Sequence, residues 1–61
     1  MQKEIIAILC RRDGITEAEA KALIKEALEQ MNEVNYESDA CEDIMAEVLG
    51  LEPDYLFDLL F

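Results

Sequence analysis

Apolar residues recur along this chain at the spacing of an α-helix, and no segment alternates polar and apolar residues as a half-buried strand does. The longest series follows the spacing i, i+3, i+4, i+7 and comprises Ala20, Leu23, Ile24, Ala27, Leu28, Met31 and Val34. An amphipathic helix of this kind has to cover its apolar face with another element. The pattern therefore predicts an all-α fold, a compact bundle of three to four short helices with no β-sheet.

The ends of these helices are marked by residues that favour helix starts and stops. Thr16 followed by Glu19 is a capping box, Gly14 and Gly50 are typical of helix C-termini, and Pro53 suits the first position of a helix. Together these signals predict helices over about 2–12, 17–34, 39–49 and 53–60. No linker or repeat interrupts the series, so we expect residues 1–61 to form a single small helical domain.

The third helix has a less clear start than the second. Either Ser38 or Asp39 is a candidate N-cap, because short polar side chains accept hydrogen bonds from the first free N–H groups of a helix. At its other end, Leu51 is expected to fold back past the terminal glycine as in a Schellman motif.

Arg11 and Arg12 lie in the last turn of the first helix, where cations suit the helix dipole. A contact with a phosphate or carboxylate is the alternative role for these two residues.

The charge of the chain lies mainly in its second half. The formal net charge is −10: residues 1–30 hold five bases and six acids (−1), and residues 31–61 hold nine acids and no base (−9). A protein that binds nucleic acid through phosphates needs a basic surface, so no direct nucleic-acid partner is expected. The candidate acidic face comprises Glu37, Asp39, Glu42, Asp43 and Glu47. It is either a solvated helix face or a mimic of DNA phosphates, as in an anti-restriction or anti-CRISPR inhibitor.

The two terminal helices carry more apolar residues than one buried face requires. A chain of 61 residues has a small core, and a helix that is apolar nearly all round must be covered on most sides. The surplus predicts a contact with a protein partner or with further copies in a homo-oligomer. The residues expected to make this contact are Ile6, Tyr55, Phe57, Leu60 and Phe61.

The residues that usually carry catalysis or hold metals are scarce. The chain has no histidine, no Gly-rich phosphate loop and only two cysteines, Cys10 and Cys41, which we expect to be small buried side chains. We therefore predict no enzyme activity, no cofactor and no metal site. The short apolar run Ile5 to Leu9 is too short for a signal sequence or a membrane span, so a cytoplasmic protein with no membrane partner is expected.

Two stretches resemble a group of known proteins. The stretch from Arg11 to Thr16, with Glu19 and Ala20, and the ending from Leu49 to Leu60 together resemble small acidic helical proteins of bacteria and their phages, a family without an assigned activity. The resemblance implies an accessory role in a phage or prophage, and it brings no catalytic motif.

A second, shorter resemblance covers residues Ala46 to Leu56. This segment is similar to the last two helices of helix-turn-helix domains of the Cro and repressor type. The resemblance implies a transcriptional regulator as a third function. Such domains need a basic recognition helix before this segment, whereas Met31 to Glu47 contains no base.

Overall fold

Residues 2–60 are described in a computed structural model, and their elements are all helical. In chain order they are α1 (Lys3–Asp13), α2 (Glu17–Glu33), α3 (Ser38–Ile44), the π-helical turn η1 (Met45–Leu49), the 3-10 turn η2 (Pro53–Tyr55) and α4 (Leu56–Leu60). No strand occurs among the described residues, which confirms the all-α prediction and the four helical segments. The described part has a radius of gyration of 10.6 Å.

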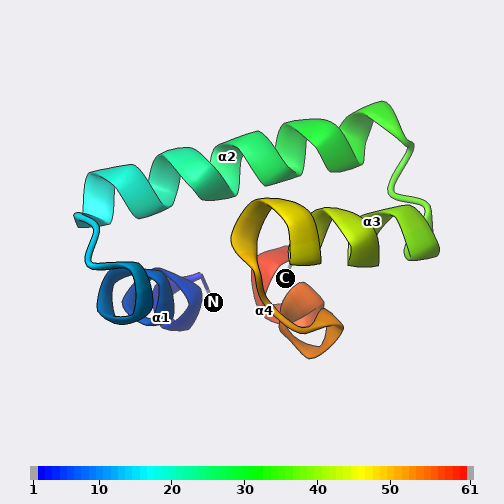
Figure 1. The fold of residues 1–61 in the computed structure, drawn as a ribbon. Coiled ribbons are helices and arrows are strands. Elements are labelled where there is room, and N and C mark those ends of the chain that lie inside the picture. The colour runs from blue at the N-terminus through cyan, green and yellow to red at the C-terminus, as the bar shows by residue number, and fades with distance from the viewer. Residues whose placement is uncertain (1, 61) are drawn as a thin grey trace.

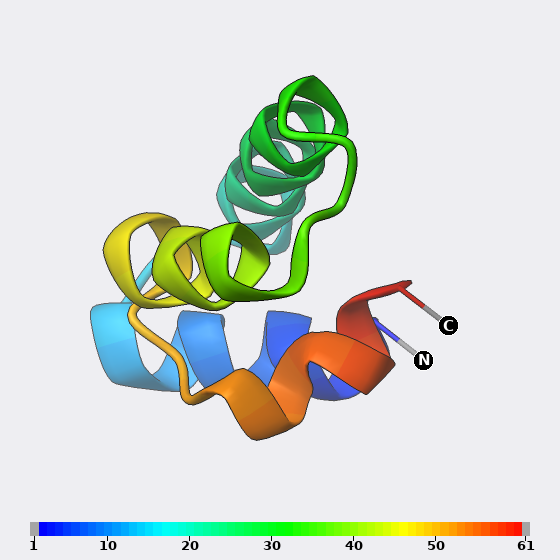
Figure 2. The same ribbon diagram turned by 90° about the vertical axis from the view of Figure 1, so that its right-hand side faces the viewer.

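The helices surround one core. The long helix α2 lies across one side of the molecule, α1 and the continuous α3–η1 segment pack beneath it, and α4 lies against α1 (Figures 1 and 2). The core consists of Ile5, Leu9, Ala20, Ile24, Ala27, Met31, Cys41, Ile44, Met45, Leu49, Leu51 and Leu59. Four of these residues belong to the apolar series of α2, so the helical spacing identified its buried face correctly.

The capping box at the start of α2 is present in full. The Thr16 hydroxyl accepts a hydrogen bond from the Glu19 N–H at 3.2 Å, and the Glu19 carboxylate accepts one from the Thr16 N–H at 3.1 Å. The bond from the Thr16 backbone, and then the one from its hydroxyl, lowers the pKa of Glu19 below its ordinary value. The charged form of Glu19 therefore stabilises the fold, because the unfolded chain lacks these bonds.

We expect this contribution to disappear in acid. A lowered folded-state pKa contributes stability above the unfolded pKa of glutamate and loses it as the pH falls through the folded value. The free energy of unfolding of the wild type should exceed that of Glu19→Gln near about pH 6, and the difference should shrink towards zero near about pH 2 to 3. Urea titrations of both proteins measure it. The other carboxylates affect both proteins equally, so they cancel in the difference between the two free energies of unfolding. A difference that does not change with pH would contradict the stabilising role of the charged Glu19.

The end of α2 is a Schellman motif built without glycine. The Asn35 N–H donates to the Asn32 carbonyl at 3.1 Å, and the Tyr36 N–H donates to the Met31 carbonyl at 2.8 Å. Asn35 and Tyr36 both have a φ of 55°. Asparagine tolerates this left-handed conformation, whereas a bulky tyrosine rarely adopts it. The motif begins a reversal of the chain that takes four residues, 34–37, so that α3 returns beneath α2 (Figure 1).

The N-cap of α3 differs from the sequence prediction. Neither Ser38 nor Asp39 caps the helix: the carboxylate of Glu37 accepts hydrogen bonds from the Asp39 N–H at 3.3 Å and the Ala40 N–H at 3.0 Å. Glu37 is extended, with φ −62° and ψ 131°, and its longer side chain bends back over the first turn. Glutamate is an uncommon N-cap, so N-cap preferences point to the shorter polar side chains of Ser38 and Asp39 instead of Glu37.

The α3 helix continues into a wider turn before it ends. In η1 the Gly50 N–H and the Leu51 N–H both donate to the Met45 carbonyl, the second at 3.2 Å, and Gly50 has a φ of 64°. Leu51 is 7% exposed, which confirms that it folds back onto the core. The π-turn adds one residue to the usual Schellman spacing and keeps Leu49 on the buried face together with Met45. Local sequence signals did not predict this extra residue.

Candidate functional site

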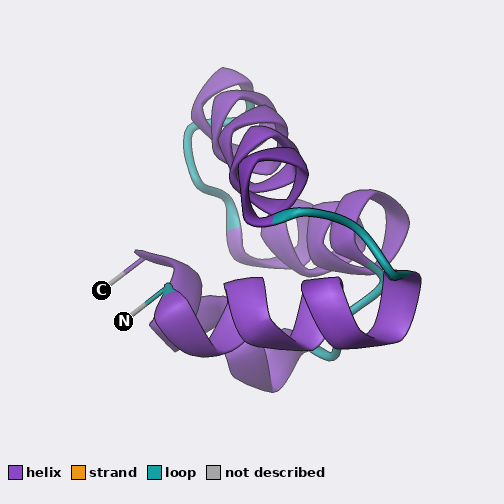
Figure 3. Ribbon diagram, turned by 90° about the vertical axis from the view of Figure 1, so that its left-hand side faces the viewer, coloured by secondary structure: helices purple, strands orange, loops and turns teal. Residues whose placement is uncertain are grey.

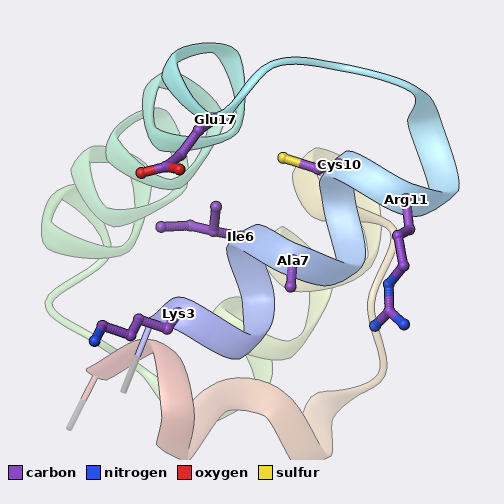
Figure 4. Close-up of a pocket in the computed structure, with 6 residues that line it drawn as sticks. All are labelled: Lys3, Ile6, Ala7, Cys10, Arg11 and Glu17. Atoms are coloured by element: carbon purple, nitrogen blue, oxygen red, sulfur yellow. The ribbon is translucent and has the colours of Figure 1, made fainter.

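The outer side of α1 contains a shallow apolar hollow. We call it the α1 hollow; its volume is about 510 Å³, and its lining residues are Lys3, Ile6, Ala7, Cys10, Arg11 and Glu17. Ile6 and Cys10 are half-buried and point towards the start of α2 (Figure 4). Ala7 is exposed between them. The predicted contact residue Ile6 therefore lies in a concave site instead of on a flat face.

The charges around the α1 hollow are mainly basic. Lys3 and Arg11 extend from opposite ends of α1, and their positions are separated by about 12 Å along the helix axis (Figure 4). Glu17 is the acidic neighbour, and its carboxylate is paired with the Lys21 ammonium at 3.2 Å. The hollow thus combines an apolar floor with two cations in a chain whose net charge is −10.

The α4 side carries the most exposed aromatic side chain among residues 2–60. Phe57 is 75% exposed, whereas Tyr55 and Leu60 are half-buried and pack against the core. Asp54 precedes Phe57 by one turn and is also exposed, so a carboxylate and an aromatic ring share one side of this segment. Phe61, which was also expected to contact a partner, lies outside the described residues. The prediction of an apolar contact therefore fits Phe57 best among the residues of this segment.

Leu60 belongs to a different hollow, at the end where the described chain ends meet. We call it the terminal hollow; it is lined by Gln2, Leu28, Tyr36, Leu59 and Leu60. The start of α1 lies near the end of α4 (Figure 3), and the Gln2 amide joins them by donating to the Leu59 carbonyl at 3.1 Å. None of its lining residues carries a charge, so this hollow offers apolar contact without an electrostatic preference.

Most of the acidic face forms one continuous row. Asp39, Asp43 and Glu47 are spaced four residues apart on α3 and η1, with Glu42 beside them, and all four are exposed. We call these four residues the acidic ridge. Within residues 2–60 none of them makes an ion pair. Glu37, the fifth predicted member, is held in the N-cap of α3 and is directed at the backbone.

Arg12 has a structural role that the sequence did not reveal. Its guanidinium donates to the Leu49 carbonyl at 2.7 Å and to the Gly50 carbonyl at 2.8 Å, and it also pairs with both oxygens of Asp13 at 2.9 Å. The hydrogen bonds with Asp13 raise the pKa of Arg12 and lower that of Asp13. Arg12 is therefore occupied by the protein itself, whereas its neighbour Arg11 stays exposed beside the α1 hollow.

The two cysteines are free thiols in different surroundings. Cys41 is 1% exposed, and burial, with a smaller effect of the Glu37 charge, raises the pKa of its thiol. Cys10 is only half-buried, so the expectation of a buried side chain is met in full at Cys41 alone. In the described part of the chain, no three Cys, Asp or Glu side chains are placed to share a metal ion. No helix of residues 2–60 is long and apolar enough to cross a bilayer.

Comparisons with models of protein families, with curated proteins and with solved structures gave no match to this chain.

Proposed function

We propose that this chain is a non-enzymatic protein–protein interaction module of the cytoplasm, a phage or prophage type of accessory protein that binds a second copy or another protein through the apolar surfaces of α1 and α4. The observation that carries the proposal is the exposure of Phe57: among residues 2–60 it is the most exposed large apolar side chain, it stands on a terminal helix, and it is not part of the hydrophobic core. Exposed aromatic residues of this kind are typical centres of protein interfaces.

The distribution of polar groups supports binding over catalysis. No carboxylate, ammonium or guanidinium group among residues 2–60 is buried, and the buried titratable group described here is the Cys41 thiol. Catalysis relies on charged or polar groups that are held in a site shielded from water. The α1 hollow is shallow and its charged residues, Lys3, Arg11 and Glu17, are exposed. Binding of an apolar side chain needs only an exposed apolar surface, and the α1 hollow and Phe57 provide one.

Self-association should be measurable by sedimentation velocity between about 5 and 500 μM. We expect reversible association in the micromolar range, and Phe57→Ser should weaken it at least about tenfold, because the aromatic contact would be lost. Val34→Ser is the matched control: Val34 is also apolar and exposed, at 38%, but it lies at the end of α2. A monomer at the highest concentration, or equal effects of the two substitutions, would argue against the proposal.

A second candidate function uses the acidic ridge as a mimic of DNA. Its four carboxylates lie between positions 39 and 47, about 12 Å apart along the helix axis, which is on average one charge per about 4 Å of axis. This density is similar to that of one DNA strand, which has one phosphate per about 3.4 Å of helix axis. The continuity of the row favours this function over scattered solvation. Binding through the acidic ridge should fall steeply as salt rises, whereas binding through Phe57 should change little.

A further inference from the structure

We infer that copies of this chain join head to tail, with Phe57 and Asp54 of one copy seated in the α1 hollow of the next. The inference rests on the proposed function and names its partner as a second copy. It starts from two separate surface features of one copy, the Phe57 side chain and the α1 hollow. Phe57 is 75% exposed and is not among the residues that line the hollow. Each copy thus displays an exposed aromatic side chain and, elsewhere, an apolar depression.

The positions of the unpaired basic side chains indicate that the α1 hollow is the docking site. The chain has five bases, and two are occupied: Arg12 by Asp13 and the end of η1, and Lys21 by Glu17. Within residues 2–60, Lys3, Arg11 and Lys25 make no ion pair. Lys3 and Arg11 both border the α1 hollow. An acidic segment of a second copy therefore finds two of the three unpaired cations at this one apolar site.

The segment around Phe57 carries acids but no base: Glu52, Asp54 and Asp58 lie within five residues of Phe57, and no base follows Lys25 in the chain. Asp54 stands one turn before Phe57 and is exposed on the same side. With a net charge of −10, two copies repel each other in most orientations. The orientation that places Asp54 near Lys3 or Arg11 replaces part of this repulsion with attraction, so electrostatics favour one mode of docking.

The apolar parts also match. Ile6, Ala7 and Cys10 form a floor for one aromatic side chain, and the hollow of about 510 Å³ leaves room for a phenyl ring. The terminal hollow lacks charged lining residues and so provides no counterpart for Asp54. When Phe57 of one copy docks on a second copy while its own α1 hollow receives Phe57 of a third, the interface is heterologous, and repeated docking produces chains or a closed ring. A reciprocal two-fold dimer, in which two copies exchange the same contact, would stop at two copies and would overturn the head-to-tail arrangement.

The substitution Phe57→Cys tests the contact directly, because Cys10 already lies in the α1 hollow and Cys41 is buried. The full chain carrying this substitution is oxidised with diamide, which accepts two electrons and two protons from two thiols, and the linked peptides are identified by mass spectrometry. We expect intermolecular links between Cys10 and the introduced thiol at least about tenfold above links between two introduced thiols. Adding Cys10→Ser should remove the ladder of oligomers. Predominance of links between two introduced thiols would overturn the head-to-tail arrangement.

Mixing two blocked variants provides an independent test. Ala7→Glu places a carboxylate in the α1 hollow at an exposed position, and Phe57→Ser removes the aromatic side chain. Each variant alone should self-associate at least about tenfold more weakly than the wild type, whereas an equimolar mixture should form a heterodimer through one intact contact. Failure of the mixture to associate overturns the arrangement and leaves the proposed function standing if the wild type self-associates. A wild type that stays monomeric overturns the arrangement together with the self-association that the proposed function includes.

Discussion

Replacing Arg12 by alanine should lower the free energy of unfolding by about 2 kcal/mol, as measured by urea denaturation followed by circular dichroism. Arg12 connects the end of α1 to the end of η1, across 37 and 38 residues of sequence, through two charge-assisted hydrogen bonds to the Leu49 and Gly50 carbonyls. The pair with Asp13 adds little, because both side chains are more than a third exposed. The lost carbonyl bonds therefore account for most of the effect.

An effect of this size is large for such a short chain. A domain of 61 residues has a stability of about 3 to 9 kcal/mol, so the variant loses about a fifth to two thirds of it. Arg11→Ala is the matched control, because it removes the same charge from the next position without losing a hydrogen bond in the described structure. Both should be measured at concentrations at which the chain is monomeric. Equal destabilisation by the two substitutions would show that charge, and not the bridge, is responsible.

The bridge also affects the geometry of the proposed interface. Leu49 and Gly50 immediately precede the short connection to η2 and α4, which carries Phe57. By anchoring that connection to the last turn of α1, Arg12 sets the position of α4 relative to the helix that contains the α1 hollow. A loosened bridge leaves the local shape of each site intact but alters their relative orientation, and chains built head to tail depend on that orientation.

Local signals determined most of the fold that was predicted from the sequence. Thr16 and Glu19 lie three residues apart, and Gly50 acts on the helix that it ends, so their roles follow from spacing alone. The bridge from Arg12 to the Gly50 carbonyl spans 38 residues and depends on how the helices pack. No pattern near Arg12 distinguishes it from Arg11. Composition likewise indicates a surplus of apolar residues at both ends of the chain. It does not show that Ile6 lies in a hollow while Tyr55 and Leu60 pack against the core, because these positions also depend on how the helices pack.

Of the two glycines, Gly50 is expected to lose more folding free energy when a methyl group is added. Gly14 and Gly50 have nearly the same left-handed conformation, with φ of 63° and 64°. A Cβ at Gly14 meets nothing within 4 Å, whereas a Cβ at Gly50 lies 3.3 Å from Arg12 Nη1 and 3.4 Å from Arg12 Nη2. Gly14→Ala should therefore cost only the backbone strain, about 1 kcal/mol. Gly50→Ala should cost about 2 kcal/mol, because the Arg12 guanidinium must also shift slightly and strain its bonds to the Leu49 and Gly50 carbonyls.

A double-mutant cycle separates these two contributions. When Arg12 is already alanine, nothing is left for the new methyl group to displace, so Gly50→Ala should then cost about 1 kcal/mol, as Gly14→Ala does. The coupling between positions 12 and 50 should accordingly be about 1 kcal/mol, and Gly14→Ala should show none with Arg12→Ala beyond about 0.5 kcal/mol. Urea denaturation of the single and double variants supplies every value in the cycle. Additive effects at positions 12 and 50 would mean that the guanidinium moves aside without losing its carbonyl bonds, and that backbone strain alone explains the glycine.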